Sequence, residues 1–192
     1  MKKTGWIIVW VIVLFVLWIV GQYNGLVSMD ENVEAARAQV ENQYQRRADL
    51  IPNLVATVQW FADQELEVFT EVTRARASAS QTNVNIDDER SLAQFQEAQW
   101  ELSSALSRLL VSVEAYPQLR SNENFLQLQS QLEGTENRIA VARMDYNTTA
   151  NTYNIAVRRV PIVFVANMLW FDRKALFEAE AWSDQAPEVS FE

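Results

Sequence analysis

Fifteen consecutive apolar residues, WIIVWVIVLFVLWIV, occupy positions 6–20 of this chain and follow two lysines, Lys2 and Lys3. Counted with its flanks, positions 4–23, the stretch has 20 residues, and a helix of that length spans roughly 30 Å, the thickness of the hydrocarbon core of a bilayer. Its last residue is a tyrosine, whose amphipathic ring suits the membrane interface. The sequence therefore predicts a membrane anchor at residues 1–25.

A cleaved signal peptide would carry a similar apolar run, and it is the alternative to a retained anchor. Cleavage needs small residues at a fixed spacing after the run, whereas this chain continues with Gly21, Gln22 and Tyr23. A lipid anchor is excluded because the chain has no cysteine to acylate. We therefore expect the run to remain as a single transmembrane helix.

The charges on the two flanks of the anchor predict its orientation. Lys2 and Lys3 lie on one side, and Asp30, Glu31 and Glu34 precede the first arginine on the other. Because positively charged flanks stay in the cytoplasm, we expect the N-terminus inside and the remainder of the chain outside the membrane.

The composition excludes several classes of function. No histidine or cysteine occurs in the 192 residues, which removes the commonest general base, thiol catalysis and thiolate metal sites. Gly134 is the one glycine beyond the anchor and its exit, so neither a phosphate-binding loop nor a nucleophile elbow can form. A formal net charge of −9 disfavours nucleic acid as a partner. We expect no catalytic centre, no cofactor and no metal site.

Residues 26–77 contain a single proline, Pro52, and no glycine. Apolar residues recur there mostly at steps of three, four and seven, as on one buried helix face: Val33, Val40, Tyr44, Ile51, Val55, Val58, Ala62, Phe69 and Val72. The pattern predicts one helix roughly 78 Å long with a kink at Pro52, because the stripe keeps its phase across the proline. The alternative is that Pro52 divides the segment into two helices.

A small, polar loop at residues 77–87 separates this helix from the next. The second helix is predicted for residues 88–116, with Asp87 or Asp88 as its N-terminal cap. Its end is set by Pro117, because the residue before a proline avoids the helical conformation.

The helix predicted for residues 121–160 has the most regular pattern in the chain. Its apolar face alternates steps of three and four, which fits coiled-coil-like packing: Phe125, Leu128, Leu132, Thr135, Ile139, Ala142, Tyr146, Tyr153 and Val157. After Pro161, residues 162–171 are apolar but too short to cross a bilayer. We expect them to begin a fourth helix that caps the bundle, with a segment lying in the membrane interface as the alternative.

No stretch alternates with the period of two that is typical of a strand. We therefore predict an all-α fold, an up-and-down antiparallel four-helix bundle at residues 26–181 that is attached to the anchor at residues 1–25. Residues 182–192 are acidic and include Pro187, and we expect them to form a flexible tail.

A continuous first helix would leave part of its apolar stripe without a partner. The second helix would cover only about 44 Å of it, starting from the end far from the membrane. The stripe around Val33, Val40 and Tyr44 would then be exposed beside the membrane. Because an exposed apolar stripe usually marks an interface, we expect self-association or a protein partner there, unless a break at Pro52 folds the two halves together.

Several short motifs differ from ordinary helical sequence: YNGLV at 23–27, RRADLIPNLV at 46–55, NENFLQLQ at 122–129, TENRIAVAR at 135–143, and Tyr-Asn pairs at 146 and 153. In these motifs, and over nearly its whole length, the sequence resembles the LemA family of bacterial membrane proteins. The resemblance implies an N-terminal membrane segment followed by a four-helix bundle. We therefore expect a single-pass protein of the bacterial inner membrane with its domain outside the cytoplasm. Family members are treated as envelope components without a defined biochemical role, and the resemblance brings no enzymatic activity. The helix linker and the acidic tail match no motif of the family.

Eleven polar or special residues in these motifs are candidates for a functional or structural role: Arg47, Asp49, Pro52, Asn53, Asn124, Glu136, Asn137, Arg143, Tyr146, Asn147 and Asn154. Arg47 lies seven residues from both Val40 and Leu54, on or beside the apolar stripe, where its charge has to reach water or an acidic partner. We expect it to be at least half-buried and paired with an acidic side chain of another helix, with Glu136 as the first candidate. For the polar residues that border the seam of helix 121–160 we expect hydrogen bonds that fix the register between helices, with a ligand site as the alternative.

Three functions follow from these observations. The first is a non-catalytic envelope protein that scaffolds or regulates a membrane partner, as a homo-oligomer or with another envelope protein. The second is a ligand-sensing bundle that signals through a partner, since bundle cores can hold small ligands. The third is a carboxylate-dependent hydrolase, which has no recognisable acidic motif in this sequence.

Overall fold

The computed structural model describes residues 2–61, 66–82 and 85–178, which are mostly helical and include no β-strand within those ranges. The predicted all-α class is confirmed. The helices are α1 (Lys2–Gln59), α2 (Leu66–Gln81), α3 (Glu89–Val113), α4 (Pro117–Arg120), α5 (Glu123–Arg158) and α6 (Ile162–Met168). The predicted tail at 182–192 lies outside the described residues.

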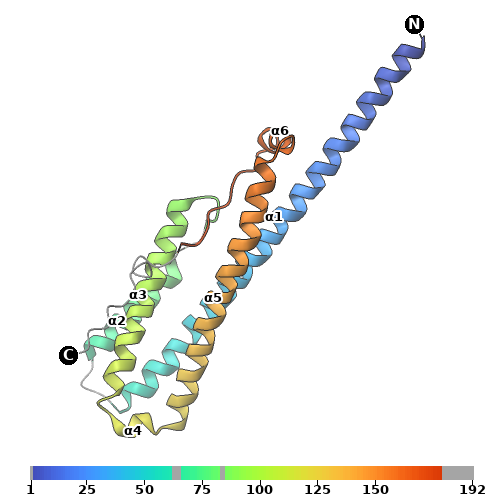
Figure 1. Ribbon diagram of the computed structural model, residues 1–192. Helices are drawn as coiled ribbons and strands as arrows, with labels where there is room; N and C mark the ends of the chain where they lie inside the picture. Colours follow the sequence, from blue (N-terminus) through green and yellow to red (C-terminus); the bar gives the residue numbers. More distant parts are fainter. Residues whose placement is uncertain (1, 62–65, 83–84, 179–192) are drawn as a thin grey trace, which may run out of the picture.

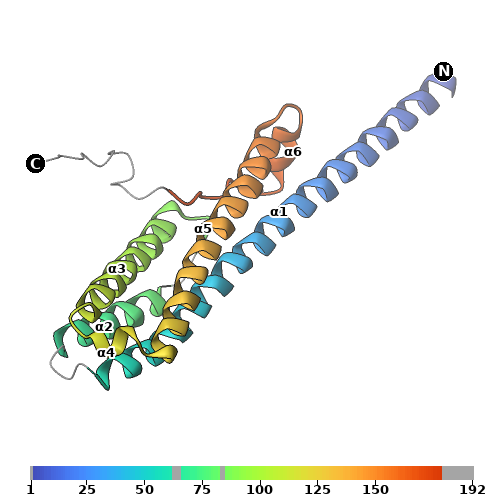
Figure 2. The same ribbon diagram turned by 60° about the horizontal axis from the view of Figure 1, so that its bottom comes forward.

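The N-terminal part of α1 projects beyond the other helices, and the rest of α1 lies beside α5 (Figure 1). α2 packs against α3 in a second pair, and α4 closes the end of the molecule far from the N-terminus, called the distal end below (Figure 2). Among the described helices, α1 is the one that is long and apolar enough to cross a membrane. The other end of the helix pairs, beside the projecting part of α1, is called proximal.

α3 starts as predicted after the cap Asp88, and α5 starts at Glu123, two residues later than predicted. The carboxylate of Asp88 accepts hydrogen bonds from the backbone N–H groups of Arg90 and Ser91, at 3.1 and 3.3 Å. The side chain of Asn122 accepts one from the N–H of Phe125 at 3.1 Å. Each cap pairs a donor that the first helical turn leaves without a partner.

The first helix ends much earlier than predicted. α1 passes through Pro52 without a break and ends at Gln59, and the chain turns at Trp60 and Phe61. The sequence does not predict this turn, because the apolar stripe keeps its phase across it. Val58 and Phe69 are 11 residues apart, a helical spacing, yet they belong to one cluster in which α2 is folded back onto α1.

The prediction of an uncovered stripe near the membrane was wrong. Val33, Val40 and Tyr44 are all buried, and they pack with residues of α5. The prediction assumed three long segments after the anchor, with the last one leading away from the membrane. The additional reversal between α1 and α2 changes the course of the chain, so that α5 returns along the proximal part of α1 (Figure 1).

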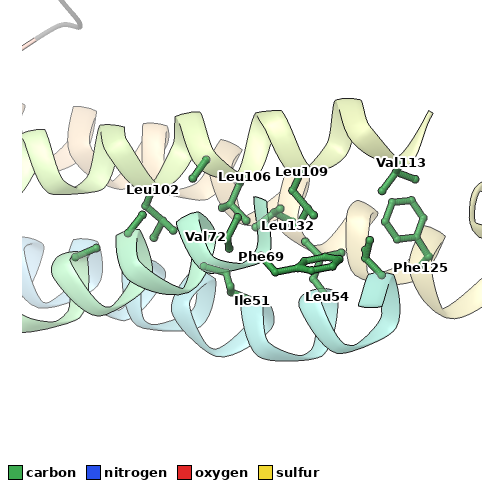
Figure 3. Packing of buried hydrophobic residues seen from close by; sticks show 14 of the residues in the cluster. Ile51, Leu54, Phe69, Val72, Leu102, Leu106, Leu109, Val113, Phe125 and Leu132 are labelled. Atoms are coloured by element: carbon green, nitrogen blue, oxygen red, sulfur yellow. The ribbon is translucent and has the colours of Figure 1, made fainter. Parts of the chain in front are cut away.

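The apolar interior consists of two clusters. The distal core joins α1, α2, α3 and α5, and Figure 3 shows its side chains meeting between these helices. Its largest members are Ile51, Leu54, Val58, Phe69, Val72, Leu102, Leu106, Leu109, Val113, Leu119, Phe125 and Leu132. The proximal core lies mainly between α1 and α5 and includes Leu26, Val33, Val40, Tyr44, Phe95, Ile139, Tyr146, Tyr153, Val157, Ala175 and Phe177.

The fourth helix that we predicted after Pro161 is only the short α6, with seven residues. Beyond it, residues 171–178 have no regular secondary structure and lead back toward α3 (Figure 2). This stretch, called the C-terminal segment below, contributes Ala175 and Phe177 to the proximal core. α2, and not a helix after Pro161, is therefore the additional long helix.

Candidate functional site

Arg47 occupies a core position of α1. Leu26, Val33, Val40, Arg47 and Leu54 follow one another at steps of seven, and all five are buried. Arg47 itself is only 2% exposed and lies where the distal and proximal cores meet. A guanidinium group in such a place needs acceptors from the neighbouring helices.

Those acceptors come from α3 and α5. Arg47 Nη1 donates to Ser103 Oγ at 2.8 Å and to Glu136 Oε1 at 2.9 Å. Arg47 Nη2 donates to the side-chain oxygen of Gln99 and to its backbone oxygen, the latter at 3.4 Å. The structure thus contains the predicted pair of Arg47 with Glu136, and one side chain ties α1 to two other helices.

The ion pair is not sealed from solvent, because the Glu136 side chain is 41% exposed. On the other side, the guanidinium carbon of Arg47 lies 5.2 Å from the centre of the Tyr44 ring, within range of a cation–π interaction. Burial raises the pKa of the Tyr44 phenol. The arrangement holds a charge in place between two apolar clusters.

Three amide side chains hold the C-terminal segment by its backbone. Asn154 accepts from the N–H of Lys174 at 2.8 Å and donates to its carbonyl at 2.9 Å. Asn147 forms the same pair of bonds with Phe177, at 2.9 and 2.8 Å. Gln96, on α3, does so with Glu178, at 3.3 and 3.0 Å. We call these three residues the amide ladder.

Further hydrogen bonds complete the backbone pairing of the segment. The Tyr146 hydroxyl donates to the carbonyl of Ala175 at 2.8 Å, and the N–H of Ala175 donates to the carbonyl of Ile86 at 2.7 Å. Arg143 Nη2 donates to the carbonyl of Glu178 at 2.6 Å. A segment without helix or sheet partners is buried at little cost because side chains pair its polar groups.

Lys174 adds a charged contact to this arrangement. Its Nζ lies 3.0 Å from a carboxylate oxygen of Asp30 and 2.8 Å from one of Asp87, and its side chain is nearly buried. Burial by itself lowers the pKa of Lys174, but the hydrogen bonds to Asp87 and Asp30 outweigh it and raise the pKa above its usual value. Burial also raises the pKa of Tyr146, and that of Tyr153 to about 12. The C-terminal segment is thereby tied to α1 and to the start of α3.

The structure brings some of the predicted residues together and leaves others apart. Glu136 makes the expected bond between helices, whereas Tyr146, Asn147 and Asn154 bind the C-terminal segment. Arg143 binds that segment and also interacts with the Tyr44 side chain of α1. Asp49, Pro52, Asn53, Asn124 and Asn137 are exposed and take part in neither cluster. Asp49 accepts a local hydrogen bond from Gln45 at 2.8 Å.

Four residues of these clusters were missed: Gln96, Gln99, Ser103 and Lys174. The two glutamines left a signal, because they fall among the apolar residues Phe95 and Leu102 on the buried face of α3. A polar side chain on such a face needs a hydrogen-bond partner, so both glutamines could have been recognised as candidates from the sequence. Lys174 left no comparable signal, since it lies outside any helical pattern.

An open cleft of about 420 Å³ borders the Arg47 cluster. Glu41, Tyr44 and Gln45 of α1 line one side, and Ser80, Phe95 and Gln99 line the other. Within the described residues no three acidic side chains are grouped so as to hold a metal ion. The carboxylate-dependent hydrolase therefore has no specific observation in its support.

Comparison with known proteins places these features in a family. The model of the LemA family matches residues 36–191, which include both the Arg47 cluster and the amide ladder.

Curated relatives agree with this match. "Magnetosome protein MamQ 2" of Paramagnetospirillum magneticum is 28% identical over 192 aligned positions, which cover 90% of this chain and 71% of that protein. "Magnetosome protein MamQ" of Magnetospirillum gryphiswaldense is 26% identical with the same coverage. "Protein LemA" of Metamycoplasma hominis is 22% identical over 166 positions, covering 86% of this chain and 73% of that protein. None of these three names denotes an enzyme.

Proposed function

The chain belongs to the LemA family, and on that premise we propose that it is a non-catalytic, membrane-anchored scaffold that holds or regulates a protein partner at the cell envelope. The length and apolarity of α1 support the first part of this proposal, as do the names of the relatives, none of which denotes an enzyme. In this proposal residues 1–25 form the anchor and residues 26–181 form an antiparallel four-helix bundle.

The single observation that carries the scaffold role is a set of three exposed apolar side chains on the outer face of α5. Val141, Met144 and Ile155 lie on one side of that helix, and each is more than half exposed. Three polar residues of α5, Glu136, Asn147 and Asn154, face the other way and are occupied by Arg47 and the C-terminal segment. Exposed apolar side chains that share one helix face indicate an interface with another protein.

The partner in this proposal is another envelope membrane protein, with a second copy of the chain as the alternative. The same stretch of α5 lies on the proximal half of the molecule, so a membrane protein could reach it from the bilayer (Figure 1). The anchor is a single helix with its N-terminus in the cytoplasm, supported by Lys2 and Lys3 before the apolar run and by Asp30, Glu31 and Glu34 after it. The bundle then lies outside the bacterial inner membrane.

Site-specific photocrosslinking in native membranes tests the scaffold role. A benzophenone amino acid at Met144 or at Ile155 should give the same crosslinked product, and at Val111, an equally exposed apolar residue on α3, it should not. Met144→Glu should abolish the product formed from position 155, while Val111→Glu leaves it unchanged. A product made of two copies of the chain identifies a homo-oligomer. No product, or the same products from position 111, contradicts the proposal.

A ligand-sensing bundle is the second candidate, because the cleft of about 420 Å³ beside Gln99 and Tyr44 is large enough for a small molecule. Melting of the full chain against a panel of envelope metabolites tests this candidate. A ligand that raises the melting temperature of the native chain, but not of Gln99→Ala, supports it. No shift with any ligand leaves the scaffold as the function.

A further inference from the structure

The stretch from Val160 to Phe171, called the tip below, ends α5, contains α6 and exposes an unusual amount of apolar surface. Val160 is 73% exposed, Phe164 71%, Met168 60% and Trp170 87%. Large apolar side chains gathered at one end of a molecule are costly in water and indicate contact with a partner or a membrane.

The position of the tip relative to α1 favours a membrane over a protein partner. α6 lies beside α1, and Pro161, Phe164 and Met168 form one apolar groove with Phe15 and Ile19. The ring of Phe171 lies 5.9 Å from that of Tyr23, edge to face. Both ribbon views show α6 beside α1, with α1 continuing beyond it toward the N-terminus (Figures 1 and 2).

The residues of α1 in this groove belong to the membrane-spanning run. With the edge of the hydrocarbon at Gln22, Ile19 and Phe15 lie three and seven residues inside it, which corresponds to depths of roughly 5 and 10 Å along the helix. Interfacial segments bury their apolar faces to about 5–10 Å. Side chains that share a groove with Phe15 and Ile19 therefore reach the acyl chains if α1 spans the bilayer.

The backbone of the tip agrees with this location. Trp170 has a φ of 61°, in the left-handed region that a bulky residue rarely adopts, and its indole is nearly fully exposed. Tryptophan is enriched where membranes meet water, so an exposed indole held in this way is suited to the interface.

The charges around the tip complement a lipid surface. Arg158, Arg159 and Arg173 flank it and are exposed, and Asp172 is the one acidic residue from position 158 to position 174. The whole chain, by contrast, carries a net charge of −9. A basic collar around an apolar tip is the pattern of segments that bind anionic lipids.

We propose that the tip is a second membrane contact: its apolar side chains enter the leaflet on the domain side, next to the anchor, and its three arginines bind anionic lipid headgroups. This inference rests on the proposed membrane-spanning anchor. The bundle is then held to the bilayer at two places, α1 and the tip, and it cannot rotate freely about a single stalk.

Spin labels at single cysteines measure the depth of the tip, because the native chain has no cysteine. The full chain, labelled at Phe164→Cys or Met168→Cys, is placed in vesicles of phosphatidylcholine with phosphatidylglycerol. A water-soluble nickel chelate should collide with these labels at least about tenfold less often than with a label at Val111→Cys, because a charged complex is excluded from acyl chains. Dissolved oxygen, which partitions into lipid, should collide with them more often.

A third label separates the tip from the anchor. Leu14→Cys is exposed on the membrane-spanning run and should be shielded from the chelate whether or not the tip inserts. Shielding at 14 with free access at 164 and 168 overturns the proposal for the tip and leaves the anchor intact. Free access at 14 overturns the anchor itself.

Two more outcomes test the choice of lipid as the occupant. Replacing Arg158, Arg159 and Arg173 with glutamine should make the labels shallower in anionic vesicles and change little in pure phosphatidylcholine. Unchanged depth in anionic vesicles contradicts the role of the arginines. Spin–spin broadening at 164 or 168, or a disulfide-linked dimer of the unlabelled cysteine variant, shows a second copy on the tip and contradicts insertion into lipid.

Discussion

The distal and proximal halves of the molecule close their apolar cores with different kinds of backbone. In the distal half four helices bring apolar side chains together, and the core is closed by helices alone (Figure 3). In the proximal half α1 and α5 leave part of their interior open, and the C-terminal segment fills the space. The first half needs only complementary helix faces, whereas the second needs partners for an irregular backbone.

This difference explains where the polar residues of the core occur. A helix pairs its own backbone groups, so the distal core can be almost wholly apolar. The C-terminal segment cannot pair its own groups, and Asn147, Asn154 and Gln96 do it instead. The Arg47 cluster lies at the border between the two halves and links α1 to α3 and α5.

The largest effect is expected in the distal core. Leu109→Ala removes a fully buried side chain among well-packed neighbours and should lower the free energy of unfolding by about 3–4 kcal/mol. Val111→Ala, at an exposed position on the same helix, should change it by less than about 0.5 kcal/mol. Urea unfolding of both variants checks the prediction, and similar midpoints contradict a tightly packed distal core.

At the border between the halves, Glu136→Gln should lower the free energy of unfolding by about 3 kcal/mol, because it leaves the buried guanidinium of Arg47 without a counter-charge. The partial exposure of Glu136 places this value at the lower end of the range for breaking a buried pair. Arg47→Met removes the charge itself and should cost less, since Glu136 can then be solvated. Thermal melts in which Arg47→Met lowers the melting temperature more than Glu136→Gln does would contradict this prediction.

In the proximal half, Asn147→Ala removes two hydrogen bonds from the backbone of Phe177 and should lower the free energy of unfolding by about 2 kcal/mol. Hydrogen exchange should show faster opening of residues 174–178 with unchanged protection in the distal helices. Asn151→Ala is the matched control, because Asn151 is exposed on the same helix. Equal loss of protection in both halves would show that the segment does not open separately.

The smallest expected effect is a loss of stability at alkaline pH that is confined to the proximal half. Lys174, Tyr146 and Tyr153 all have pKa values raised above those of the unfolded chain, so the stability that they contribute is fully present below about pH 10 and is lost as the pH rises through the folded values. Hydrogen exchange or near-ultraviolet circular dichroism between about pH 9 and 12 measures it. Tyr153→Phe should reduce the dependence, and an unchanged pH profile contradicts the assignment.

Much of this architecture was predictable from particular residues. The apolar run before Tyr23, the caps Asp88 and Asn122, and the placement of Arg47 on a buried stripe each follow from local physical rules. The pair of Arg47 with Glu136 followed because a buried charge needs an opposite charge nearby. The end of α1 did not follow, since no glycine or proline lies between Val58 and Phe69 and the stripe continues in phase.

The sequence by itself determined that this protein is helical, that its N-terminal helix is apolar enough to span a membrane, and which helix faces are buried, because periodicity and hydrophobicity are local properties. Only the tertiary structure decided how the helices meet. It placed α5 over the stripe at Val33 and Val40, and it gave Asn147 and Asn154 a backbone to hold. The reason is physical: a turn between two helices with the same phase, and a segment held by its backbone, leave no periodic mark in the chain and depend on contacts between residues that are far apart in sequence.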